Sequence, residues 1–386
     1  MRVMRAEPSR FADVTSRSVG AAWRSYDLQL TTYAGLLGAI GLVMAYTNSV
    51  EAGQSLLAGG TTFSRALMWS ALAIVAFTIM TALDYRWLKT LAWPIYGVNL
   101  GLLVLTLVIG DGVGGSARWV NVGPFTFQFS ELAKILMITV LAAYLGNREG
   151  HLDSLSAILG ACLLMAPTIL LVMMQPDLGS SLVLASILAG MLFMSGASLR
   201  WLLAMAAGVL VAIPIAWTYV LRDYQQNRIL SFLNPAADAL GSRWQVTQSQ
   251  IAIGAGGFLG TGLTNGTQSR GDFLPVQESD FVFAVLAQEL GFIGAVVVFL
   301  LFTALIWRIL SCAWRSRDPF GTLFGAGLAS MLLFQVFVNV GMVIGILPVT
   351  GIPLPFISHG GASLVSIAIG LGVIQSVNIR QHRAEW

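Results

Sequence analysis

Asp280 has the sequence surroundings of a group that does chemistry. It lies in Glu278-Ser279-Asp280-Phe281, where a long polar segment meets an apolar stretch. A carboxylate held at such a boundary can accept the proton of a reacting hydroxyl group. Asp280 is therefore a candidate general base, with the N-cap of the following helix as the structural alternative.

Glu131 and Lys134 form a second candidate. They are three residues apart at the start of an apolar run, a spacing that places both on one face of a helix. Charges just inside a membrane helix are costly unless they pair or line a wet cavity. We expect either an ion pair that supports the helix end or a polar wall for a charged substrate.

A short turn motif is expected to shape the site without doing chemistry. In Gln175-Pro176-Asp177-Leu178-Gly179, proline presets the backbone of a turn and Asp177 can cap the next helix. We expect Gln175, Asp177 and the isolated His359 to be structural residues of this kind.

Several arginines lie in the polar segments between apolar runs, among them Arg118, Arg228 and Arg243. A guanidinium group suits phosphate oxygens because it offers paired N–H donors. Arginines and carboxylates beside apolar helices indicate a substrate with a phosphate head and a lipid tail.

Other kinds of site are disfavoured by the pattern. The glycines between 254 and 266 lack a strand-to-helix context, so they indicate close backbone approach and not a nucleotide-binding loop. The two cysteines and three histidines do not have metal-site spacing. A net charge of +3 does not suggest nucleic acid.

Composition predicts the elements that must position these residues. Of 386 residues, 56% are hydrophobic and 10% are charged, against about 25% charged in a soluble domain. This indicates an all-α integral membrane protein with a single polytopic domain over residues 1–386. Runs long enough to cross a bilayer lie near 28–48, 65–83, 88–110, 131–146, 155–174, 179–196, 200–221, 281–310, 321–346 and 360–379.

The distribution of basic residues predicts the orientation. With the N-terminus inside, the cytoplasmic side receives fourteen Lys and Arg and the outer side seven, as the positive-inside rule requires. This N-in, C-in topology gives a cytoplasmic tail at 1–27 and a large outer loop at 222–279. All the candidate site residues then lie on the outer side.

The motifs together resemble the SEDS family (shape, elongation, division and sporulation), which includes RodA and FtsW. They are the Gln-rich and Gly-rich segment 245–257, Gly-Thr-Gln-Ser at 266–269, the stretch 280–291 and Leu-Pro-Val-Thr-Gly-Ile-Pro-Leu-Pro-Phe at 347–356. The short tails and Gly-Thr-Gln-Ser are closer to RodA. Departures include Phe129 for proline, Glu278 for histidine, Gln288 for glutamate and His359 for tyrosine.

The resemblance implies a peptidoglycan glycosyltransferase of the bacterial cytoplasmic membrane. It would join lipid II units into glycan strands on the outer face for cell elongation and shape. Asp280 matches the family's essential aspartate, and Glu131 and Lys134 match its Ser-Glu-x-Ala-Lys motif. The chemistry could also use a divalent cation, magnesium or manganese. A flippase for lipid II and a non-catalytic scaffold are the alternative functions.

The resemblance also implies a partner, a class B penicillin-binding protein. We expect its membrane helix to dock on the runs between 281 and 346, where Gln335 and Asn339 share a helical face. Its outer domain would lean on the 222–279 loop.

Overall fold

The computed structural model describes residues 25–51, 53, 60–113, 116–122, 125–148, 154–219, 221–234, 242–266, 280–358 and 360–380. Helices occupy all ten predicted apolar runs, which confirms the all-α membrane fold. Within the described residues, nine of these helices are long and apolar enough to cross a membrane, and α8, with 17 residues, is shorter. The ten are α2 (Leu28–Glu51), α3 (Thr62–Ala82), α5 (Ala92–Ile109), α6 (Phe129–Gly146), α7 (Leu155–Met174), α8 (Leu178–Met194), α9 (Leu199–Tyr219), α13 (Val282–Arg315), α14 (Pro319–Val343) and α15 (Gly361–Arg380).

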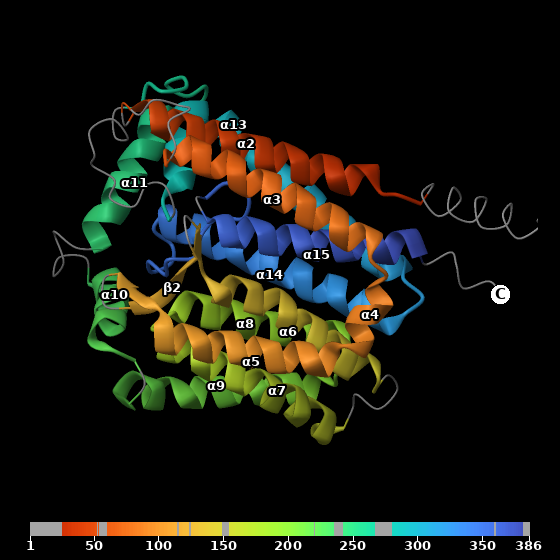
Figure 1. The fold of residues 1–386 in the computed structure, drawn as a ribbon. Helices are drawn as coiled ribbons and strands as arrows, with labels where there is room; N and C mark the ends of the chain where they lie inside the picture. Colours follow the sequence, from red (N-terminus) through yellow and green to blue (C-terminus); the bar gives the residue numbers. More distant parts are fainter. Residues whose placement is uncertain are drawn as a thin grey trace, which may run out of the picture.

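The bundle is organised around α14, α15 and α6, as Figure 1 shows. In the most apolar 18-residue stretch of each helix, 78% of the residues of α14 and 89% of those of α15 are buried. In the corresponding stretch of α9, no residue is buried. The helices α2 and α3 lie on one side of this centre, and α5, α7 and α9 lie on the other. A helix that is apolar yet exposed along its length faces lipid, so α9 belongs to the periphery.

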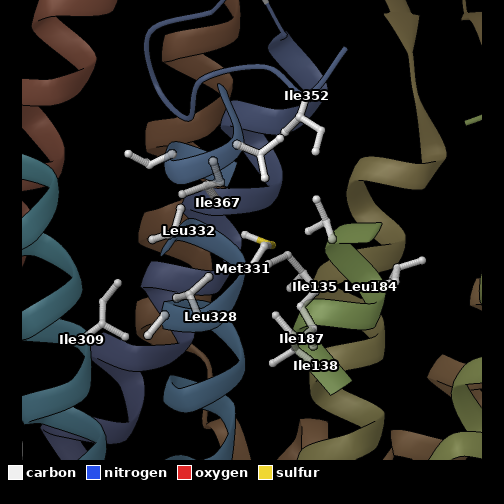
Figure 2. Close-up of a cluster of buried hydrophobic side chains, with 14 of the residues drawn as sticks. Ile135, Ile138, Leu184, Ile187, Ile309, Leu328, Met331, Leu332, Ile352 and Ile367 are labelled. Carbon is white, nitrogen blue, oxygen red and sulfur yellow. The ribbon is translucent and has the colours of Figure 1, made fainter. Parts of the chain in front are cut away.

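Close packing beneath the end of the bundle that carries Asp280 fixes the central helices. Figure 2 shows Ile135 of α6, Leu184 of α8 and Met331 of α14 meeting in one apolar cluster, with Ile352 above them. Ile135 follows Lys134 directly in the chain, and Ile352 belongs to the connection 344–360. The polar site therefore rests directly on the apolar core.

Short elements between the long helices were not predicted from the sequence. The connection between α5 and α6 forms an antiparallel sheet in the order β1-β2-β3, and α4 precedes α5. The described residues of the segment predicted as a large loop contain two helices, and residues 235–241 and 267–279 lie outside the described part of the chain. The elements are α4 (Tyr85–Thr90), β1 (Asp111–Val113), β2 (Ser116–Val122), β3 (Phe125–Phe127), α10 (Asp223–Leu233) and α11 (Ser242–Gly256).

Helix α13 is broken at Gly291, which has φ 69° and ψ −170°. The turn that follows α11 pairs with the break: Thr261 N donates to Gln288 O at 3.0 Å, and Phe292 N donates to Gly257 O at 2.9 Å. A Cβ on Gly291 would lie 2.3 Å from the nitrogen of Gly260. The glycines thus permit a close backbone approach, which confirms the prediction made for them.

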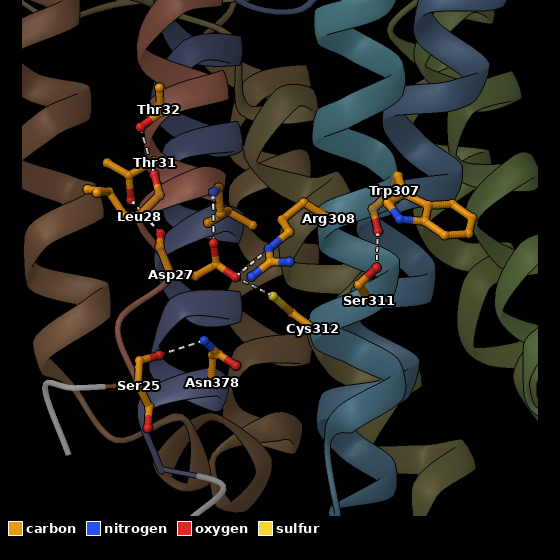
Figure 3. A network of polar contacts seen from close by, with 11 residues as sticks. Ser25, Asp27, Leu28, Thr31, Thr32, Trp307, Arg308, Ser311, Cys312 and Asn378 are labelled. Atoms are coloured by element: carbon orange, nitrogen blue, oxygen red, sulfur yellow. Dashed lines mark hydrogen bonds and ion pairs between the residues drawn. The ribbon is translucent and has the colours of Figure 1, made fainter. Parts of the chain in front are cut away.

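A polar network ties the start of α2 to the far end of α13 (Figure 3). Asp27 accepts a hydrogen bond from Leu30 N at 2.9 Å and so caps α2. Its second oxygen pairs with Arg308 Nε at 2.6 Å and accepts from Cys312 Sγ at 3.2 Å. This contact fixes the end of the bundle that lies opposite Asp280.

Candidate active site

Asp280 lies just before α13 and is half-buried. The helix N-cap is Phe281, so the interpretation of Asp280 as the N-cap is wrong. Asn339 of α14 fixes the main chain at Asp280. Its Nδ2 donates to the carbonyl of Asp280 at 3.1 Å and to that of Ile352 at 2.8 Å. One buried amide therefore fixes Asp280 relative to the connection between α14 and α15.

Arg228 of α10 reaches the same connection as Asp280. A Cβ built on Gly351 would lie 3.5 Å from Asp280 Oδ2 and 3.7 Å from Arg228 Nη1. Gly351 has φ 72°, a conformation that favours glycine. Arg228 Nη1 also donates to Val349 O at 3.4 Å. A carboxylate and a guanidinium group thus converge beside one glycine.

Arg243 of α11 lies in the same region. It lines, with Arg228, a small crevice against Pro348 and Val349. Both arginines were predicted to bind substrate phosphate, and the fold brings both to the connection beside Asp280.

Glu131 and Lys134 form a buried ion pair in the first turns of α6. Lys134 Nζ lies 2.6 Å from Glu131 Oε1, and the side chains are 1% and 6% exposed, respectively. The shared helical face is therefore confirmed, and the ammonium and carboxylate compensate each other. Such a pair is tolerated in an apolar bundle because each charge has its counter-ion within hydrogen-bond distance.

Asp177 caps α8, as predicted, and also holds the start of α6. Its Oδ1 accepts from Ser180 N at 3.1 Å, while its Oδ2 accepts from Gln128 Nε2 at 2.9 Å and from Ser130 Oγ at 3.1 Å. Ser130 immediately precedes Glu131. The buried carboxylate therefore joins the turn to the helix that carries the ion pair.

Gln175 and Arg118 brace the same turn. Gln175 Nε2 donates to Leu103 O of α5 at 3.0 Å. Arg118 Nε donates to Gln175 O at 3.1 Å, and its Nη2 donates to Pro176 O. Arg118 was predicted to bind substrate; in this structure its Nε and Nη2 donate to main-chain carbonyls of the turn, and substrate binding by Arg118 stays a prediction.

The connection between α14 and α15 links the two halves of the site. A Cβ on Gly179, in the first turn of α8, would lie 3.0 Å from Thr350 O and 2.9 Å from Ile352 Cγ1. Gly351 lies between these two residues in the chain, and a Cβ built on it would lie beside Asp280 and Arg228. The cap at Asp177 and the candidate base thus lie against one segment.

Sequence reasoning missed Asn339, Gly351 and Gly179 as positioning residues, and it had placed Asn339 and Gln335 on a partner-binding face. Both are at most 1% exposed, so neither can contribute to a lateral surface. The predicted structural residue His359 lies outside the described residues. Among the described residues, no cluster of three or more His, Cys, Asp or Glu side chains is arranged to hold a metal.

Comparison with known proteins places this fold and site in a family. The chain matches the cell cycle protein family of FtsW, RodA and SpoVE over residues 27–383. It is 41% identical over 310 residues to peptidoglycan glycosyltransferase MrdB of Escherichia coli (strain K12), which covers 80% of this chain and 83% of that protein. It is 36% identical over 360 residues to stage V sporulation protein E of Bacillus subtilis (strain 168), covering 92% of this chain and 97% of that one.

Solved structures agree over almost the full length. One of them is a chain of a peptidoglycan synthase complex whose structure concerns the coordination of polymerization and crosslinking. It superposes with a TM-score of 0.78 at 32% identity, covering 94% of this chain and 99% of that one. The rod shape determining protein RodA of Thermus thermophilus superposes with a TM-score of 0.68 at 29% identity, covering 93% and 99%. The predicted family and enzyme class are confirmed. The chain belongs to the FtsW, RodA and SpoVE family of membrane-embedded peptidoglycan glycosyltransferases.

Proposed function

We propose that Asp280 is the general base with which this peptidoglycan glycosyltransferase polymerises lipid II. The observation that carries the proposal is the convergence of the Asp280 carboxylate and the Arg228 guanidinium beside Gly351. Glycosyl transfer requires the acceptor hydroxyl to lose its proton as its oxygen attacks the anomeric carbon of the donor. A half-buried carboxylate at this position can take that proton.

The neighbouring arginines suit the departing diphosphate. As the bond from the anomeric carbon to the diphosphate oxygen breaks, negative charge develops on the leaving group, and fixed cations stabilise that charge. Arg228 and Arg243 line the same crevice and can supply paired N–H donors. An α-linked donor that becomes a β-linked polymer requires one displacement with inversion.

A groove between α2, α3 and α15 suits the polyprenyl chain. Two hollows share residues of all three helices and Phe356. The outer hollow contains Arg65, Trp69 and Trp119, whereas the inner one is lined almost entirely by apolar side chains. The shared residues are Gly38, Leu42, Ser70, Phe356 and Leu364. A cation at the mouth and an apolar interior match a lipid that ends in a phosphate.

A divalent cation remains part of the proposal as a further requirement. Mg²⁺ often binds through one or two carboxylates plus substrate phosphates, so it does not need a dedicated cluster of protein ligands. Such an ion would neutralise charge on the diphosphate. If polymerisation by the purified enzyme continues unchanged after chelation with EDTA, this requirement is wrong.

The partner we propose is a class B penicillin-binding protein in the bacterial cytoplasmic membrane, with the enzyme in the N-in, C-in orientation. Gln335 and Asn339 are buried, so we place the docking face on exposed apolar side chains of the same helices instead. Leu300 and Trp307 of α13, with Leu333 and Phe337 of α14, are 59–72% exposed. Single cysteines at these four positions should crosslink to the partner's membrane helix. Crosslinks confined instead to the exposed face of α3 would place the interface elsewhere.

The polymerisation of labelled lipid II by the purified full chain tests the function. In nanodiscs without a partner, the chain is expected to produce glycan polymers. A flippase would move labelled lipid II across a vesicle membrane without forming polymer. A scaffold would form polymer neither alone nor with a partner whose own glycosyl transfer is absent, and that result would overturn the proposed function.

A further inference from the structure

Two carboxylates meet where the last turn of α2 lies against α13. Glu289 of α13 is 1% exposed, and Glu51 of α2 lies close enough to interact with it electrostatically. Thr264 N, in the turn after α11, donates to Glu289 Oε1 at 3.1 Å. Glu289 follows Asp280 by nine positions, more than two turns of helix. The glycosyltransferase site described above uses neither carboxylate.

The described groups around Glu289 leave its charge unbalanced. They are the backbone N–H of Thr264, the hydroxyl group of Thr47 and the second carboxylate of Glu51. Among the described residues, no donor reaches the buried Oε2 of Glu289. A buried carboxylate is costly unless it is paired or coordinates a metal, and a like charge nearby adds to that cost. The pair therefore requires positive charge.

Asn48 is an independent indication of a ligand at this place. It is 3% exposed, and within the described part of the chain neither its Oδ1 nor its Nδ2 has a hydrogen-bond partner. Asn48 follows Thr47 by one residue and precedes Glu51 by three, so the three side chains project from the side of α2 on which Thr47 meets Glu289. An amide oxygen beside two carboxylates is a ligand that a hard cation prefers.

The end of α2 favours a cation for a second reason. This 24-residue helix ends at Glu51, and the C-terminal end of a helix carries partial negative charge. Ser49 Oγ accepts a hydrogen bond from Phe63 N at 2.8 Å, which fixes the same end against the start of α3. Glu51 is only half-buried, so an ion from water can reach the pair.

We propose that Glu289, Glu51 and Asn48 Oδ1 bind one Ca²⁺ ion that joins the end of α2 to α13. Two carboxylates match the charge of a divalent cation. Ca²⁺ accepts carboxylate, amide and water oxygens in flexible geometry, whereas Mg²⁺ demands a near-ideal octahedron. The ion is structural and is separate from the cation proposed for the diphosphate. Through Glu289 it also stabilises the turn that contains Thr264.

Thermal unfolding of the purified full chain during a Ca²⁺ titration tests this site. After EDTA treatment and removal of the chelator, the Tm should rise by about 2 °C at ten times the dissociation constant. Isothermal titration calorimetry should detect one bound ion per chain. Glu289→Gln and Glu51→Gln should each lose both signals. Asn48→Asp should bind Ca²⁺ more tightly, since affinity rises with the number of charged ligands.

Two control variants show whether the ion occupies this site. Asp223→Asn alters an exposed acid of α10 and should keep both signals, and their loss would assign them to general surface charge. Asp280→Asn should also keep them, and their loss would place the ion at the glycosyltransferase site instead.

The remaining contrary outcomes are equally clear. If Ca²⁺ neither binds nor changes the Tm of the unmodified chain, the proposal is wrong and the two carboxyl groups hold protons. Signals that persist unchanged in Glu289→Gln would place the ion elsewhere. If Glu289→Gln does not fold, Glu51→Gln and Asn48→Asp decide: unchanged affinity in both would overturn the site.

Discussion

Removing one of the two buried charges, Glu131 or Lys134, is expected to cost far more stability than removing both. Their atoms are 2.6 Å apart and nearly inaccessible, which gives about 6 kcal/mol of Coulomb attraction at an effective dielectric constant of about 20. That attraction offsets a desolvation penalty of several kcal/mol for each ion. Lys134→Met or Glu131→Gln alone leaves one ion without its partner, so each should lower the free energy of unfolding by about 3–5 kcal/mol. The double variant leaves no buried ion and should lose about 1 kcal/mol or less.

Equilibrium unfolding of the three variants in one detergent measures these differences. Polymerisation of labelled lipid II is then compared where all three are folded. An inactive but stable double variant would show that the charges act in the active cavity. A double variant that regains both stability and activity would show that the pair has only a structural role. Losses below about 1 kcal/mol in both single variants, the size typical of a surface pair, would refute the argument from burial.

Three further substitutions test how the site is held in place. Gly291→Ala should lower the free energy of unfolding by at least about 2 kcal/mol, because alanine is strained at positive φ and its Cβ would meet backbone; Gly101→Ala, with nothing within 4 Å, is the control and should not. Asp177→Ala removes a cap and the acceptor of two side chains, at a cost of about 2–3 kcal/mol in denaturant unfolding. Asp177→Asn keeps an acceptor oxygen, so an equal loss in both variants would contradict the assigned bonds. Asn339→Leu should reduce the polymerisation rate at least about tenfold, a barrier change of about 1.4 kcal/mol, whereas Asn99→Leu, remote from the site, should affect stability alone.

The candidate catalytic and substrate-binding residues could be predicted from the sequence because charge is conspicuous in an apolar chain. Asp280, Glu131 and Lys134 each interrupt or border a run of apolar residues, and placing a charge there is costly without a compensating role. The ten apolar runs were found for the same reason, since bilayer thickness sets the length of a spanning helix.

The positioning residues depend on contacts that no local pattern contains. Asn339 bonds to the carbonyl of a residue 59 positions away, and Gly351 matters only because Asp280 and Arg228 approach it from other elements. A polar residue four positions from another looks the same whether its helix face meets lipid or protein. That ambiguity is why Gln335 and Asn339 were assigned to the wrong surface.

Helices α10 and α11 were missed because hydropathy was the guiding signal. Helix α10 has Gln225 three residues after Arg222, and the side-chain oxygen of Gln225 accepts from Arg222 N at 2.9 Å. This is half of a capping arrangement, and the spacing of Gln225 from the helix start was available in the sequence. The sheet β1–β3 has strands of three to seven residues, too short for a clear alternation.

The polymerisation rate of the Asp280→Asn variant tests the central claim most directly. Asparagine keeps the size of the side chain but cannot act as the base, and the main-chain carbonyl that Asn339 holds is unchanged. The purified variant should fold, bind labelled lipid II and form no polymer, while Asp223→Asn, which alters an exposed acid at the start of α10, should polymerise normally. Polymer formed by Asp280→Asn at the rate of the unmodified enzyme would contradict the assignment of Asp280 as the base.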